Sequence, residues 1–135
     1  MSARTWPKIV LILLISTDLH ALLPPSPQPS WLSLPLPSWL QSRLLSNEKT
    51  PHPLPIQSLA LPLLLPLSNI TASSQSLIIN SPTSSGKTLA YTLPLLAHID
   101  PSIRNSVQAI IIVRSRELGL QVSRVVKSLA AAYPF

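Results

Sequence analysis

The stretch of this chain that most constrains its fold is a loop of small residues between an apolar run and a helix-forming segment. The apolar run covers 77–79, the loop covers 81–88 with the sequence SPTSSGKT, and the helix-forming segment covers 89–96. A strand, a loop that ends in Gly-Lys-Thr and a helix are typical of a phosphate-binding loop. The N–H groups of such a loop and of the following helix N-terminus point to one place and attract an anion. The pattern therefore predicts an α/β unit with a phosphate site.

Three residues of this loop have chemistry that suits a nucleotide. Gly86 lets the backbone approach phosphates without a Cβ in the way. Lys87 offers a point charge to the outer phosphates, and the Thr88 hydroxyl is placed to ligate Mg²⁺. The general pattern is G-x-x-x-x-G-K-[ST], and Ser81 holds its first glycine position. The alternative interpretation is a Ser/Thr-rich loop that only caps a helix.

A second strand and helix are predicted after the first pair. The unbroken run VQAIIIV at 107–113 favours a central parallel strand with both faces buried. A loop at 114–117 and a helix over about 116–131 follow. The predicted fold class is therefore α/β, with one βαβα unit. Because its crossover is expected to be right-handed, the loops 81–88 and 114–117 should face the same ligand side of the sheet.

The N-terminal part has a different composition. Twelve of the 16 prolines lie before residue 67. In 22–38 they favour an extended, disordered chain in which Trp31 and Trp39 are exposed. Residues 39–47 can form one or two helical turns. We therefore expect a disordered Pro/Ser/Leu-rich segment over 1–50 and a folded domain over 51–135, which is at most one ordinary domain.

The first residues allow three interpretations of targeting. The apolar run 9–15 is too short to span a bilayer. It fits an organelle transit peptide, an untargeted low-complexity segment or the core of a secretory signal, and we rank them in that order. An intracellular location is expected, in a plastid or mitochondrion if the transit interpretation holds and in the cytoplasm or nucleus otherwise.

Charge and composition narrow the partners. Ten Lys/Arg stand against four Asp/Glu, a net charge of +6, which suits either a polyanion partner or a solvated basic surface. The absence of cysteine excludes disulfides and thiolate metal sites. The three histidines, His20, His52 and His98, have no metal-ligand spacing.

Three motifs in order resemble the start of a DEAD-box ATP-dependent RNA helicase. SPTSSGKTLAYTLPLL at 81–96 is similar to the family's motif I, and RSRELGLQV at 114–122 is similar to motif Ia. PLPIQSLALPLLL at 53–65 resembles the Q motif. The resemblance implies a partial RecA-like (P-loop NTPase) parallel sheet, ATP and Mg²⁺ as cofactors, and RNA as partner.

The resemblance also implies site residues. Gln57 would read the adenine edge, Thr88 would ligate Mg²⁺, and RNA would be held by its backbone without sequence preference. The implied ATP-binding residues are Gln57, Thr83, Ser84, Ser85, Gly86, Lys87 and Thr88. The implied RNA-binding residues are Arg114, Ser115, Arg116 and Glu117.

Departures from the family pattern carry further expectations. Ser84 stands where the family has glycine, and a serine held at positive φ strains the loop by roughly 1 kcal/mol or more. The 135 residues contain no Asp-Glu-Ala-Asp, and Asp100 and Glu117 are the only carboxylates after Thr88. No catalytic residue is assigned, and the chain resembles a truncated helicase that binds ATP and RNA without turning ATP over. The alternative is a non-functional or regulatory product that binds nucleic acid or a partner.

Overall fold

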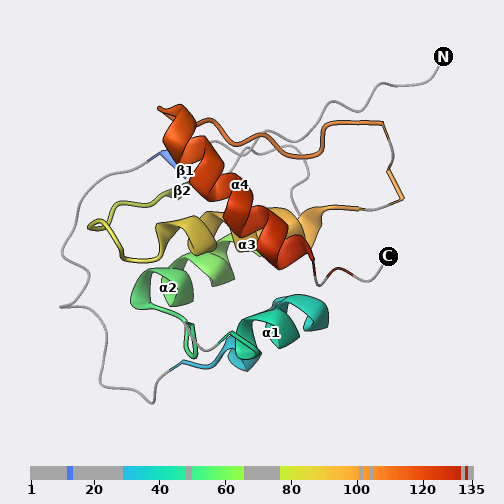
Figure 1. Ribbon diagram of the computed structural model, residues 1–135. Helices are drawn as coiled ribbons and strands as arrows, with labels where there is room; N and C mark the ends of the chain where they lie inside the picture. Colours follow the sequence, from blue (N-terminus) through green and yellow to red (C-terminus); the bar gives the residue numbers. More distant parts are fainter. Residues whose placement is uncertain are drawn as a thin grey trace.

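The computed structural model in Figure 1 describes residues 12–13, 29–47, 50–65, 77–100, 102–103, 105–131 and 133. The targeting interpretations fall mainly outside these residues. In the described part no helix is both long and apolar enough to cross a membrane. The elements in chain order are strand β1 (Ile12–Leu13), 3₁₀-helix η2 (Trp31–Ser33), helix α1 (Ser38–Leu45), helix α2 (Pro55–Leu64), strand β2 (Leu77–Ile78), helix α3 (Lys87–His98) and helix α4 (Arg116–Ala130).

The residues at and just before the first turn explain where the helices begin. Pro55 is the first residue of α2, where a fixed φ is favourable and a missing N–H costs nothing. The Ser115 hydroxyl accepts a hydrogen bond from the N–H of Leu118, at 3.2 Å, and so caps α4. Gly86 precedes α3 in the left-handed conformation and offers no side-chain cap. The helical turns predicted within 39–47 and the helix predicted over about 116–131 are confirmed, the helix-forming segment 89–96 lies within α3, and α2 covers residues 55–64.

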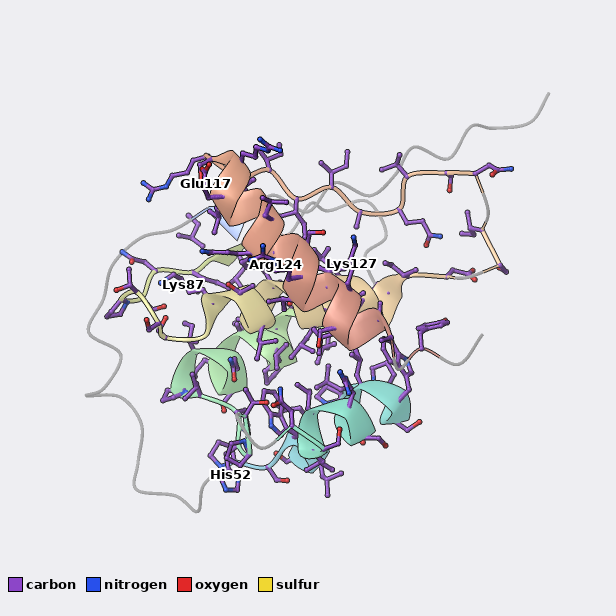
Figure 2. All side chains as sticks on the ribbon, in the orientation of Figure 1. His52, Lys87, Glu117, Arg124 and Lys127 are labelled. Atoms are coloured by element: carbon purple, nitrogen blue, oxygen red, sulfur yellow. The ribbon has the colours of Figure 1, made fainter. Side chains whose placement is uncertain are left out.

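Helix α3 packs against α2 on one side and α4 on another. In Figure 1, α4 crosses α3, and α1 lies below them. Figure 2 shows Arg124 and Lys127 on the side of α4 that points away from the other helices.

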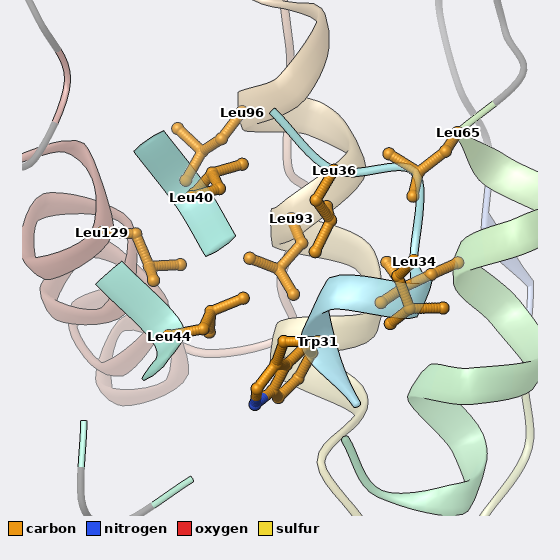
Figure 3. Packing of buried hydrophobic residues seen from close by; sticks show 10 residues of the cluster. Trp31, Leu34, Leu36, Leu40, Leu44, Leu65, Leu93, Leu96 and Leu129 are labelled. Carbon is orange, nitrogen blue, oxygen red and sulfur yellow. The ribbon is translucent and has the colours of Figure 1, made fainter. Parts of the chain in front are cut away.

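The principal core joins these helices to the N-terminal segment. Figure 3 shows Trp31 and leucines of the segment 31–44 against leucines of α2, α3 and α4. Trp31 is fully buried, and its indole Nε1 donates to the carbonyl of Thr50 at 2.8 Å. The buried members are Trp31, Leu34, Leu36, Leu40, Leu44, Leu61, Leu65, Leu93, Leu96 and Leu129.

The expectation that Trp31 is exposed in a disordered linker is therefore wrong. Proline excludes a regular helix, but it does not stop every second or third side chain of an extended segment from facing one side. Here Leu34 and Leu36 are buried while the intervening Pro35 is exposed. Trp39 is half-buried, and its ring meets Tyr133 edge-on with centroids 4.8 Å apart. The division of the chain at residue 50 remains a prediction, although residues on both sides of it share this core.

The predicted central strand is not formed. Residues 107–113 are extended without strand assignment, and Ile112 is 87% exposed. Strand β2 lies within the apolar run 77–79 and pairs in parallel with β1, Ile12 opposite Leu77 and Leu13 opposite Ile78. A buried parallel strand needs paired neighbours and helices over both faces. In the described part 107–113 has neither, so the prediction of a buried strand there is wrong.

Candidate functional site

The loop between β2 and α3 has the backbone of a phosphate-binding loop. Ser84 and Gly86 have φ of 64° and 88°, both in the left-handed region. The family has glycine at the position of Ser84, which suggested a positive φ there, and Ser84 has one. Glycine adopts it without cost, whereas serine pays a steric penalty of roughly 1 kcal/mol or more.

Unused backbone donors line this loop. In the described part, the N–H groups of residues 84–88 donate to no other backbone group. The first turn of α3 also has no side-chain cap. Helix N-termini leave such donors for a cap, water or an anion, and a left-handed loop residue directs them to one side. The loop is thus chemically suited to an anion with several oxygens.

Lys87 folds back over the loop. Its Nζ donates to the carbonyls of Ser81 and Pro82, and it lies 3.4 Å from the Ser85 hydroxyl. The hydroxyls of Ser81 and Ser85 are hydrogen-bonded to each other. Phosphate oxygens would give this ammonium anionic partners in place of neutral carbonyls, and such charge-assisted bonds are about twice as strong. Ser81 was not among the predicted site residues, and its signal was its place at the start of the loop pattern.

Thr88 lies half-buried in the first turn of α3. Its carbonyl accepts from the Thr92 hydroxyl at 2.7 Å. Its own hydroxyl has no hydrogen-bond partner in the described residues, so it is available as a ligand. The same residues contain no group of three His, Cys, Asp or Glu side chains that could hold a metal ion. A Mg²⁺ ion here would be held mainly by the phosphates themselves, with Thr88 as its protein ligand.

Gln57 connects α2 to the loop. Its Oε1 accepts from the N–H of Leu54 at 2.8 Å, and its Nε2 donates to the carbonyl of Gly86 at 3.1 Å. These partner types settle which amide atom is which. The side chain is 1% exposed. A Cβ at Gly86 would overlap the Gln57 amide and lie 2.8 Å from Leu54 Cδ1. Gln57 and Gly86 therefore fit only as a pair.

Asp100 lies away from the loop, beyond the C-terminal end of α3. Asp100 accepts from the hydroxyl and the N–H of Ser102, at 2.6 and 2.9 Å. These bonds lower the pKa of the Asp100 carboxyl below its ordinary value. Asp100 is twelve residues after Thr88, roughly 18 Å along the helix direction. It cannot share a metal ion with Thr88.

The second predicted segment lies at the N-terminus of α4. Arg114, Arg116 and Glu117 are exposed, whereas Ser115 is half-buried and occupied by its cap to Leu118. Figure 2 shows Glu117 and Lys87 toward the same end of the molecule. The structure gives no contact between the two loops, so a common ligand side remains a prediction.

Part of this chain is similar to known proteins. Residues 54–134 match the model of the DEAD/DEAH box helicase family. DEAD-box ATP-dependent RNA helicase 58, chloroplastic, is 46% identical in Oryza sativa subsp. japonica and 44% identical in Arabidopsis thaliana, each over 79 residues. These stretches are 58% of this chain and 16% and 15% of the relatives. DEAD-box ATP-dependent RNA helicase 47B of the same rice is 37% identical over 110 residues, 74% of this chain and 18% of the relative. The chain thus spans under a fifth of the length of these relatives.

Proposed function

Because this chain belongs to the DEAD/DEAH box helicase family, we propose that it forms the ATP-binding and RNA-binding portion of an RNA helicase. The observation that supports this most directly is the loop before α3. This loop has two residues with left-handed backbone and N–H groups that donate to no other backbone group. It leads into a helix N-terminus without a side-chain cap, and its Lys87 has only neutral hydrogen-bond partners.

In this proposal the loop holds the phosphates of ATP. Lys87 exchanges the carbonyls of Ser81 and Pro82 for phosphate oxygens, and Thr88 holds Mg²⁺ that also binds the phosphates. Magnesium neutralises phosphate charge in the bound nucleotide. The proposed ATP-binding set is Gln57, Thr83, Ser84, Ser85, Gly86, Lys87 and Thr88.

Gln57 has a proposed role at the adenine and a second at the loop. To present its amide to adenine it must give up at least one of its bonds to Leu54 and Gly86. Nucleotide recognition at Gln57 and the conformation of the loop at Gly86 would then be linked, since one amide serves both.

RNA binding is proposed at the start of α4. Arg114, Arg116 and the helix N-terminus suit phosphate oxygens, which carry no sequence information, so binding is sequence-independent. Ser115 supports this surface as the cap of α4, and Glu117 belongs to the predicted set.

ATP hydrolysis by these 135 residues alone is not proposed. Phosphoryl transfer to water needs a carboxylate near Mg²⁺ and a group that positions water. Asp100 lies at the far end of α3, and the sequence has no Asp-Glu-Ala-Asp. A chain that binds nucleic acid or a partner without turnover is the second candidate, favoured by this shortage of carboxylates.

The location proposed is intracellular, with the plastid as one destination. The support is the Ser-rich, acid-poor start of the chain and the chloroplastic relatives in rice and Arabidopsis. The plastid destination is tested by fusing residues 1–50 to a fluorescent protein and measuring its import into isolated chloroplasts. A fusion that stays outside the chloroplasts would contradict this destination.

Calorimetric titration of the 135-residue chain with Mg-ATP tests the nucleotide site. We expect a dissociation constant on the order of millimolar, about 4 kcal/mol of binding free energy, because Ser84 strains the loop and Gln57 must give up a hydrogen bond to reach adenine. Lys87→Ala should abolish the heat of binding, and circular dichroism should show an unchanged helix content. Equal binding of Mg-ATP by the Lys87→Ala chain would contradict the proposed nucleotide site. RNA-stimulated ATP hydrolysis by the unmodified chain would contradict the expectation that these residues alone do not turn ATP over.

A further inference from the structure

The outer face of α4 carries cations that none of the predicted motifs includes. Val122 and Leu129 are buried and set the inner side of this helix. At 100° per residue, Arg116, Arg124 and Lys127 lie on the opposite side. All three are exposed, and Figure 2 shows Arg124 and Lys127 pointing away from the rest of the molecule.

These cations lack the acidic partners that are usual on a solvent-exposed helix. Such helices usually alternate acidic and basic residues three or four positions apart. The only carboxylate of α4 is Glu117, at its first turn. In the described residues Arg124 and Lys127 have no hydrogen-bond or ion-pair partner. From Arg116 to Lys127 the helix rises about 16 Å, so the unpaired charge is spread along its length.

A further cation is held at the flank of α4, near its C-terminal end. Arg43 belongs to α1, 85 residues before Ser128, yet its Nε donates to the Ser128 carbonyl at 3.1 Å and its Nη2 to the Ser128 hydroxyl at 3.3 Å. The fold therefore brings two distant segments together and holds a guanidinium at Ser128, the residue that follows Lys127 in α4. This arrangement cannot be derived from the α4 sequence alone.

We propose that Arg124, Lys127 and Arg43 form a second phosphate-binding surface, which continues along α4 from Arg114 and Arg116 and binds the sugar-phosphate backbone of RNA. The proposal rests on the RNA binding proposed above at the start of this helix. Charge complementarity selects the ligand, since phosphates recur every few ångströms along a nucleic-acid strand and match a linear row of cations better than a single anion does. Arginine can bind a phosphate through two N–H groups, and lysine binds it as a point charge.

The test measures binding of the 135-residue chain to a fluorescein-labelled single-stranded RNA of about 12 nucleotides. Anisotropy is recorded over a series of KCl concentrations. Arg124→Gln/Lys127→Gln should weaken binding about tenfold at low salt, and it should reduce the slope of log K against log[KCl] by about 1.4, since each single-strand phosphate contact contributes about 0.7. Circular dichroism melting of this variant should match that of the unmodified chain, because both side chains are exposed.

Two further variants separate this surface from general charge. Arg124→Lys/Lys127→Arg keeps both cations and should retain affinity and slope within twofold. Arg4→Gln/Lys8→Gln removes the same net charge from the N-terminus and should leave the slope unchanged. An unchanged slope in Arg124→Gln/Lys127→Gln, or an equal loss in Arg4→Gln/Lys8→Gln, would overturn the proposal.

The primary RNA site has its own readout in the same assay. If Arg116→Gln weakens binding while Arg124→Gln/Lys127→Gln does not, the proposed function stands and the second surface is wrong. If the unmodified chain shows no binding at low salt, both are wrong.

Discussion

At the scale of single residues, the loop 81–88 combines one accommodating and one unfavourable position. Gly86 and Ser84 both have left-handed backbone, but only glycine adopts it without steric cost. The hydroxyl of Ser84 makes no hydrogen bond in the described part that would offset this cost. The structure thus turns a difference from the family pattern into a local source of strain.

Ser84→Gly should stabilise the chain. Removal of the Cβ at φ 64° relieves up to about 1 kcal/mol, and we expect the free energy of unfolding in urea to rise by that amount. Mg-ATP should bind at least as tightly as before. Ser85→Gly is the matched control, since Ser85 does not have positive φ and loses its bond to Ser81, so this variant should be less stable. A less stable Ser84→Gly chain would contradict the strain argument.

Gly86→Ala should be strongly destabilising, by about 2 kcal/mol or more, because the new methyl group overlaps the Gln57 amide at a backbone position that strains any L-residue. Adding Gln57→Ala should restore part of the loss. A double-mutant cycle by urea unfolding measures this coupling. Strictly additive effects of the two substitutions would show that Gln57 and Gly86 do not restrict each other.

At the scale of elements, residues 107–113 form an apolar segment whose side chains are largely exposed in the described part of the chain. Val107, Ile110 and Ile112 are 59%, 57% and 87% exposed. Seven residues without charge, proline or glycine, held extended and open to solvent, match segments that pair with other chains. The base of the segment is held by Gln108, whose amide bonds to Asp100 and Ile103.

Ile112→Lys should reduce self-association of the chain without loss of stability. The side chain makes little contact in the folded chain, and a charge on an open strand opposes pairing. Light scattering as a function of protein concentration measures the effect, and thermal unfolding checks the fold. Leu32→Lys is the control, since Leu32 is 63% exposed outside this segment. Equal improvement by both variants would mean that added charge, and not this segment, decides solubility.

At the scale of the whole molecule, the N-terminal segment and the helices depend on each other. Trp31, Leu40 and Leu44 supply a large part of the core that covers Leu93 and Leu129. Without the segment 31–44, Leu61 of α2, Leu93 and Leu96 of α3 and Leu129 of α4 would lose part of their apolar cover. We therefore expect residues 51–135 to be poorly soluble by themselves, because these leucines would be exposed in addition to the segment 107–113.

Trp31→Ala should lower the free energy of unfolding by about 3–5 kcal/mol, the usual range for loss of a buried aromatic ring, and it also leaves the Thr50 carbonyl without its donor. Leu32→Ala, one residue further and exposed, should change it by less than about 0.5 kcal/mol. Urea unfolding followed by circular dichroism compares the two. Equal, small effects would show that the N-terminal core does not stabilise the helices in solution.

Local sequence determined the helices and the phosphate-binding loop. Gly-Lys-Thr after an apolar run and Ser115 before an amphipathic stretch are short-range signals, and caps, periodicity and backbone preference act within one or two turns. The place of Trp31 in the core and the bond from Arg43 to Ser128 could not be predicted in this way. Both join parts of the chain that are far apart in sequence, where proline content indicated only an extended backbone.

The run 107–113 also separates what local sequence determines from what tertiary structure decides. Its residues favour a strand, but in the structure the segment forms neither helix nor strand. Whether such a run becomes a buried strand depends on neighbouring strands and covering helices, which are properties of the assembled sheet. Sequence thus determined conformation and motif chemistry in this protein. Tertiary structure decided which apolar residues are covered, because burial requires partners that local sequence does not contain.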